Sequence, residues 1–217
     1  MNKSMTLERL YFCSIVFLFG NVAILISTLS ILGKINSTFF FLKNLDYFAY
    51  GGYVLLAISM LFLFRFNKRF KEAFATSIII VVCAALSLVC LNFENIDIIY
   101  YLYDGFDFSV FLLLVMFYYY SILGFSNIFN DKFSVDEKKK FKRFLIVIFI
   151  FKALSVVYDI VTMFYFVIKS YWVNFILRNF NYLNNFLTAV VVIILSITII
   201  RIITKIRKGI IKEDEEK

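Results

Sequence analysis

Two charged residues in one apolar run of the sequence are the side chains best suited to chemistry. Lys152 and Asp159 lie seven positions apart in a run that extends from about residue 144 to residue 168, and Ser155 lies between them. Seven residues make about two turns of α-helix, so these side chains share one face, although a rise of about 10.5 Å keeps the two charges out of direct contact. Because a charge in the bilayer costs roughly 2.5 to 3.5 kcal/mol on insertion scales, such residues usually mark a functional site.

Asp159 needs a partner inside the bilayer, which is a polar side chain on another helix, a water-filled cavity or a proton. Asn21 lies in the middle of the first apolar run, and we predict a polar centre made of Asn21, Lys152, Ser155 and Asp159. Two interpretations are open, because such a centre is either a pathway for a solute, ion or proton, or a buried polar latch that fixes helix packing. Further polar side chains at depth in the runs are Ser59, Tyr118, Tyr119, Tyr120, Ser121, Ser196 and Thr198.

The residue types that enzymes and metal sites use most often are scarce. The sequence has no histidine, which removes the commonest metal ligand and the usual general base. Cys13, Cys83 and Cys90 all lie in apolar runs and form no Cys-x-x-Cys pair, so we interpret them as inert buried thiols. We therefore predict no metal, no cofactor and no enzymatic activity. An acid–base enzyme built on lysine, aspartate and tyrosine is the least supported alternative.

Apolar runs long enough to cross a membrane occupy most of the chain. The 217 residues are 62% hydrophobic, with a mean hydropathy of +0.87, whereas a soluble globular domain contains about half apolar residues. A membrane-spanning helix needs about 20 apolar residues, so the sequence predicts an all-α integral membrane protein, a bundle of about six transmembrane helices in a single polytopic domain, 1–217. The predicted spans are about 10–32, 47–64, 74–91, 106–128, 144–168 and 180–200, followed by a basic and acidic tail, 201–217.

The positive charges predict the orientation of the chain in the membrane. Most Lys and Arg residues lie at the N-terminus, in 65–71, in 132–143 and in 201–217, which a six-span arrangement places on one side. Segments rich in Lys and Arg remain in the cytoplasm, so both termini are predicted to be cytoplasmic and the membrane to be a cell membrane, the bacterial plasma membrane. The net charge of +8 then reflects topology and anionic lipid head groups at the basic loops rather than nucleic acid.

Small residues in three of the runs mark places where helices can approach closely. Gly51 and Gly52 lie in the second run, Ala84 and Ala85 in the third, and Gly124 in the fourth. None of them forms a Gly-x-x-x-Gly motif, so ordinary packing is the preferred interpretation.

A small transporter or channel component that uses the polar centre is the function that the sequence favours. The alternative is a non-transporting accessory, assembly or immunity-type subunit, which contacts the lipid bilayer and binds a protein partner, or a second copy of itself, through its helices and basic face. Lys152 and Asp159 separate the two functions, because a transporter requires them to line a continuous polar cavity, whereas an accessory protein would seal them in apolar packing.

Overall fold

The described part of the chain is all-α in this computed structural model, as the sequence predicts. Its main helices are α1 (Lys3–Thr28), α3 (Tyr47–Leu63), α4 (Lys68–Leu91), α5 (Asp97–Phe129) and α7 (Tyr171–Glu215). The residues that the structure describes are 3–29, 45, 47–91, 97–129, 139, 142–144, 146–151, 153–154, 157 and 171–215.

Four helices within these described ranges are long and apolar enough to cross a membrane, as expected of a multi-pass membrane protein. Their apolar stretches are Leu7–Thr28, Lys68–Cys90, Phe108–Ile128 and Phe186–Lys208. Helix α3 is apolar as well, but its 17 residues make a helix only about 26 Å long, slightly less than the hydrocarbon layer of roughly 30 Å. The predicted fifth span, 144–168, lies mostly outside the described residues, so the six-span bundle remains a prediction.

Large apolar side chains are exposed on each of these helices. The exposed fractions of Phe19, Phe62, Val89, Met116 and Ile194, one from each helix, lie between 47% and 60%. A soluble monomer rarely exposes so much apolar surface, whereas in a bilayer these side chains contact the acyl chains of the lipids. The exposed surface therefore supports the predicted contact with a lipid bilayer.

Helices α5 and α7 are longer than the spans predicted from the sequence. Helix α5 begins at Asp97, although the predicted span begins at about residue 106, and α7 continues to Glu215 through most of the predicted tail, 201–217. Hydropathy marks only the part of a helix that lies in lipid, and the sequence contains no proline that would end a helix earlier. With 45 residues, α7 is about 68 Å long, more than twice the thickness of the hydrocarbon layer.

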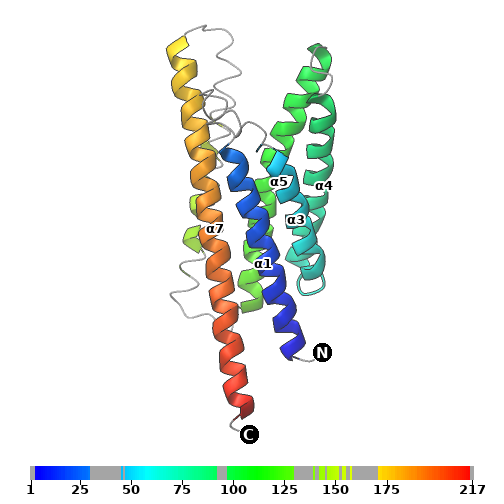
Figure 1. Cartoon of the computed structure of the whole chain (residues 1–217), viewed down its shortest axis with the longest axis vertical. Coiled ribbons are helices and arrows are strands. Elements are labelled where there is room, and N and C mark those ends of the chain that lie inside the picture. Colours follow the sequence, from blue (N-terminus) through cyan, green and yellow to red (C-terminus); the bar gives the residue numbers. More distant parts are fainter. Residues whose placement is uncertain are drawn as a thin grey trace.

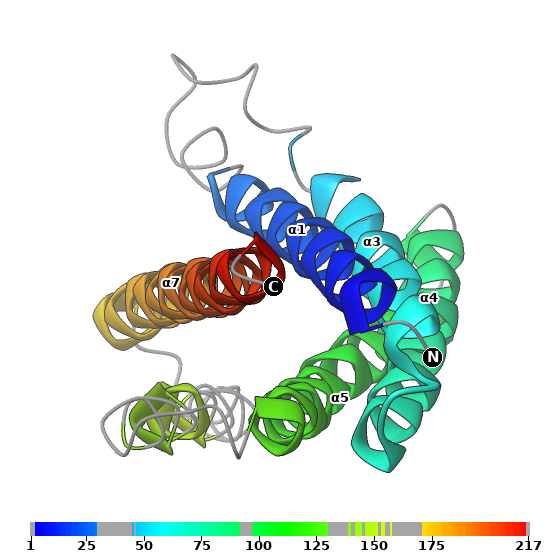
Figure 2. The same ribbon diagram turned by 90° about the horizontal axis from the view of Figure 1, so that it is seen from below.

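The helices follow one another around the bundle in the order α7, α1, α3, α4 and α5 (Figure 2). Helix α4 packs along α5, and α1 lies between α3 and α7. The N-terminus, the C-terminus and the turn between α3 and α4 all lie at one end of the bundle (Figure 1). This arrangement brings together segments that are far apart in the sequence.

The end of the bundle that holds both termini carries most of the described positive charge, and we call it the cation-rich end. One ion pair there connects two helices, because Arg207 of α7 lies 3.7 Å from Glu8 of α1, with its guanidinium 5.9 Å from the ring centre of Tyr11. Both charged side chains are exposed, so the pair contributes little stability. The cation-rich end comprises Arg9, Arg65, Lys68, Arg69, Lys71, Arg201, Lys205, Arg207 and Lys208.

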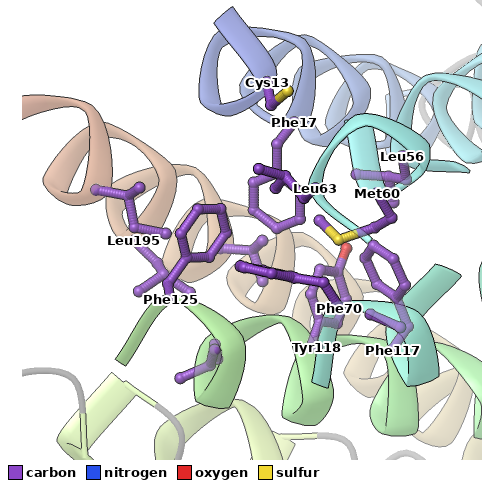
Figure 3. Close-up of a cluster of buried hydrophobic side chains, with 14 of the residues drawn as sticks. Cys13, Phe17, Leu56, Met60, Leu63, Phe70, Phe117, Tyr118, Phe125 and Leu195 are labelled. Atoms are coloured by element: carbon purple, nitrogen blue, oxygen red, sulfur yellow. The ribbon is translucent and has the colours of Figure 1, made fainter. Parts of the chain in front are cut away.

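Four phenylalanine rings fill the middle of the bundle (Figure 3). Phe17 of α1 packs against Phe117 and Phe125 of α5, with 6.1 Å between ring centroids in both pairs. Phe70 of α4 meets Phe125 edge to face at 5.0 Å. All four side chains are at most 1% exposed, so large buried rings hold α1, α4 and α5 together.

Glycines allow two pairs of helices to approach closely. A Cβ atom on Gly52 of α3 would lie 2.7 Å from the carbonyl oxygen of Gly20 in α1, and a Cβ atom on Gly124 of α5 would lie 2.6 Å from the ring of Phe70. Such distances are shorter than real contacts, so a larger residue at either position would displace a helix or a packed ring. Gly51 meets nothing within 4 Å, so the two adjacent glycines have different roles.

Candidate functional site

Asn21 lies at the centre of a hydrogen-bonded cluster that joins three helices. The hydroxyl of Tyr118 in α5 donates to the Asn21 side-chain oxygen, Oδ1, over 2.8 Å. The Asn21 amide nitrogen, Nδ2, donates to the carbonyl oxygen of Phe17 over 2.8 Å and makes a longer contact of 3.5 Å with the hydroxyl oxygen of Ser196 in α7. We call Asn21, Tyr118 and Ser196 the Asn21 cluster.

Each member of the Asn21 cluster is buried and hydrogen-bonded. Asn21 is 1% exposed, Tyr118 4% and Ser196 0%, and the Ser196 hydroxyl also donates to the carbonyl oxygen of Val192. A hydrogen bond between helices in a membrane stabilises the packing by about 0.6 kcal/mol on average and by at most about 1.7 kcal/mol. The cluster therefore fixes the relative positions of α1, α5 and α7, and its hydrogen bonds add a modest amount to the stability of the bundle.

Buried apolar side chains lie close to each member of the Asn21 cluster in the sequence. Phe17 lies one helical turn before Asn21, and Phe117 precedes Tyr118, with 5.4 Å between their ring centroids (Figure 3). Leu195, which precedes Ser196, is fully buried. All three polar groups are uncharged at neutral pH and already paired, so the arrangement is suited to fixing helix positions rather than to transferring protons.

Of the four residues in the polar centre predicted from the sequence, the structure describes one. Asn21 is described, whereas Lys152, Ser155 and Asp159 lie outside the described residues. Among the described residues, the side-chain partners of Asn21 are Tyr118 and Ser196, which the sequence indicates only as polar side chains at depth. Three other hydroxyls at depth bond elsewhere: Ser59 to the Leu56 carbonyl, Ser121 to the Met60 sulfur and Thr198 to the Ile194 carbonyl.

A second buried amide, which the sequence analysis did not single out, ties α7 to the predicted fifth span. The Asn184 side-chain amide donates to the carbonyl oxygen of Phe151 over 2.6 Å. Asn184 is 4% exposed, and the hydroxyl of Thr188 donates to its backbone carbonyl. The sequence does contain a signal for this buried amide, which is the pair of asparagines at 184–185 inside the predicted span 180–200. Phe151 belongs to the predicted span 144–168 and directly precedes Lys152 in the sequence.

Two open grooves lie toward the cation-rich end, and neither is lined by the Asn21 cluster. The first, which we call the cation groove, has a volume of about 690 Å³ and lies between α7 and residues 143–147. The second, the α1–α3 groove, has a volume of about 650 Å³. The cation groove is lined by Arg143, Phe144, Val147, Val191, Thr198, Arg201, Ile202 and Lys205. The α1–α3 groove is lined by Glu8, Arg9, Phe12, Cys13, Leu61, Phe62, Phe64 and Arg65.

Metal-ligating side chains do not gather anywhere in the part of the chain that the structure describes. No group of three or more His, Cys, Asp or Glu residues there could hold a metal ion. Cys13 is buried, and Cys83 and Cys90 are half-buried free thiols. The chain has no match among protein families, curated proteins or solved structures, so its function is inferred from these residues alone.

Proposed function

We propose that this multi-pass membrane protein is a non-transporting, non-enzymatic accessory or assembly subunit. The observation that carries the proposal is the closed Asn21 cluster, in which each side chain is buried and bonded to the protein itself. A transport pathway requires polar groups that exchange partners with water or solute, and buried groups that are fully paired do not do so without local rearrangement. The Asn21 cluster therefore favours the latch over the pathway.

Within the described part of the chain, the lipid-facing helices and the cation-rich end are the surfaces open to a partner. We propose that the cation-rich end faces the cytoplasm of a bacterial cell, as the predicted orientation requires. Because α7 is more than twice as long as the hydrocarbon layer, part of it lies beyond the membrane. An acidic segment of a membrane partner is the chemistry that complements this end.

Transport remains the second candidate function because of two residues in the predicted fifth span. Lys152 and Asp159 are charged residues in an apolar run, and charges in such positions mark ion or proton pathways in many membrane proteins. The contact of Asn184 with Phe151 supports this candidate, because it brings the beginning of that run against α7.

Replacing Asp159 by asparagine distinguishes the two functions. Asp159→Asn keeps the shape of the side chain but removes its titration, and Lys152→Met removes the opposite charge. In liposomes with an imposed pH gradient, we expect wild type and both variants to dissipate the gradient no faster than liposomes without protein. In detergent, Asp159→Asn is expected to unfold at the wild-type temperature or above, because a buried carboxylate is destabilising.

A proton flux that depends on Asp159 is the result that would support transport. A proton flux carried by the wild-type protein, and lost in Asp159→Asn while the variant still folds, would contradict the accessory function and establish the transporter. Protein-free liposomes prepared in parallel provide the background rate, and thermal unfolding of each variant shows whether a loss of flux reflects a loss of fold.

A further inference from the structure

The cation groove combines positive charge with apolar walls. Arg143 and Arg201 line it from two segments far apart in the sequence, and Lys205 lies one turn beyond Arg201 on α7. The other described lining residues are apolar apart from Thr198, whose hydroxyl donates to the Ile194 carbonyl. Arg201 lies within the apolar stretch Phe186–Lys208, so we place the groove near the boundary between hydrocarbon and head groups.

We propose that the cation groove binds one anionic phospholipid. Its phosphate is held by Arg143 and Arg201, and an acyl chain lies along Val147, Val191 and Ile202. Guanidinium groups suit this role, because they donate parallel hydrogen bonds to phosphate oxygens. Basic pockets between transmembrane helices on the cytoplasmic side are typical sites for anionic head groups. The site does not depend on the proposed accessory function and would serve a transporter equally well.

The cation groove differs from the α1–α3 groove in the charge of its lining. The α1–α3 groove is lined by Glu8 together with Arg9 and Arg65, whereas every charged residue among the described lining of the cation groove is positive. An anionic head group is therefore attracted to the cation groove, because the described lining carries three cations and no carboxylate. The apolar walls favour a lipid over a free anion, because a free anion gains nothing from them.

Native mass spectrometry of the full-length protein in detergent tests the proposal with phosphatidylglycerol and phosphatidylcholine as probes. We expect one phosphatidylglycerol to be retained per chain, and phosphatidylcholine to be lost. Replacing both arginines, Arg143→Gln with Arg201→Gln, should weaken phosphatidylglycerol binding about 30-fold, which corresponds to about 2 kcal/mol for two cations. Lys68→Gln with Lys71→Gln removes the same charge from exposed positions in neither groove and should leave binding unchanged.

Two further measurements address the acyl chain and the source of the phosphate. Val147→Trp fills the groove from an exposed position while both arginines remain, and it should also weaken lipid binding. Excess inorganic phosphate should not displace the lipid. The proposal is overturned if phosphatidylcholine binds as tightly as phosphatidylglycerol, if the double arginine variant behaves like the double lysine control, or if inorganic phosphate competes effectively. Val147→Trp protein that retains lipid at wild-type affinity would also overturn it.

Discussion

Gly52→Leu is expected to destabilise this bundle strongly, because α1 and α3 touch at this position. A Cβ atom on Gly52 would lie 2.7 Å from the Gly20 carbonyl oxygen and 2.8 Å from the Cγ1 atom of Ile24, so even Gly52→Ala must push the two helices apart. Overpacking of this kind lowers the free energy of unfolding by about 1 to 3 kcal/mol, and leucine should have the larger effect. Thermal unfolding in detergent, followed by circular dichroism, measures the difference.

Gly51→Ala is the matched control for this experiment. Gly51 is the preceding residue on the same helix, it is exposed, and a Cβ atom there meets nothing within 4 Å. Because alanine favours a helix over glycine by about 1 kcal/mol, Gly51→Ala should unfold at the wild-type temperature or slightly above it. If Gly51→Ala and Gly52→Ala proved equally stable, the close approach of α1 to α3 would be wrong.

Asn21→Leu is expected to lower the free energy of unfolding by about 1 to 3 kcal/mol, because it leaves the Tyr118 hydroxyl buried without its acceptor. Tyr118→Phe should have a smaller effect, since the asparagine keeps its bond to the Phe17 carbonyl. The double variant should be more stable than Asn21→Leu alone, because it leaves neither hydrogen-bonding group of the pair unsatisfied. A double-mutant cycle on unfolding in detergent gives the coupling energy, expected at about 0.6 to 1.7 kcal/mol.

Tyr119→Phe provides the control for the tyrosine. Tyr119 is 44% exposed and follows Tyr118 directly, so removing its hydroxyl should leave stability unchanged and show no coupling with Asn21→Leu. A coupling energy near zero for Asn21 with Tyr118 as well would show that their hydrogen bond does not hold α1 to α5.

The helices of this protein follow from the sequence because apolar runs of about 20 residues have few other structures open to them in a membrane. The ends of α5 and α7 do not follow from it. Hydropathy changes at the edge of the lipid, whereas α7 continues as far as Glu215, since its polar tail still satisfies its own backbone hydrogen bonds. The predicted orientation and the number of spans remain predictions.

Of the Asn21 cluster, only Asn21 belonged to the predicted polar centre, and the sequence did not predict which side chains it bonds. Asn21, Tyr118 and Ser196 could each be assigned a depth from the sequence, but depth does not say which helices are neighbours around the bundle. For the same reason, the sequence did not distinguish the role of Gly51 from that of Gly52. It also did not indicate that Arg143 and Arg201 line one groove. The parts played by Lys152, Ser155 and Asp159 stay predictions, because these residues lie outside the described ranges.

A thiol placed at Ser196 tests most directly whether the Asn21 cluster is closed. Ser196→Cys changes one side-chain atom at a position that is 0% exposed, 3.5 Å from the Asn21 amide nitrogen. The three native cysteines are first replaced by alanine, so that the new thiol is the only one. Lys208→Cys, at an exposed position of the cation-rich end, is the positive control.

The protein is reconstituted in vesicles with a small charged methanethiosulfonate reagent on both sides of the membrane. The latch predicts that the Ser196→Cys thiol stays unmodified in the folded protein and reacts fully after denaturation, whereas the Lys208→Cys thiol reacts at once. Modification of the Ser196→Cys thiol in the folded protein would show that water reaches the centre of the bundle, and it would contradict the closed latch on which the proposed function rests.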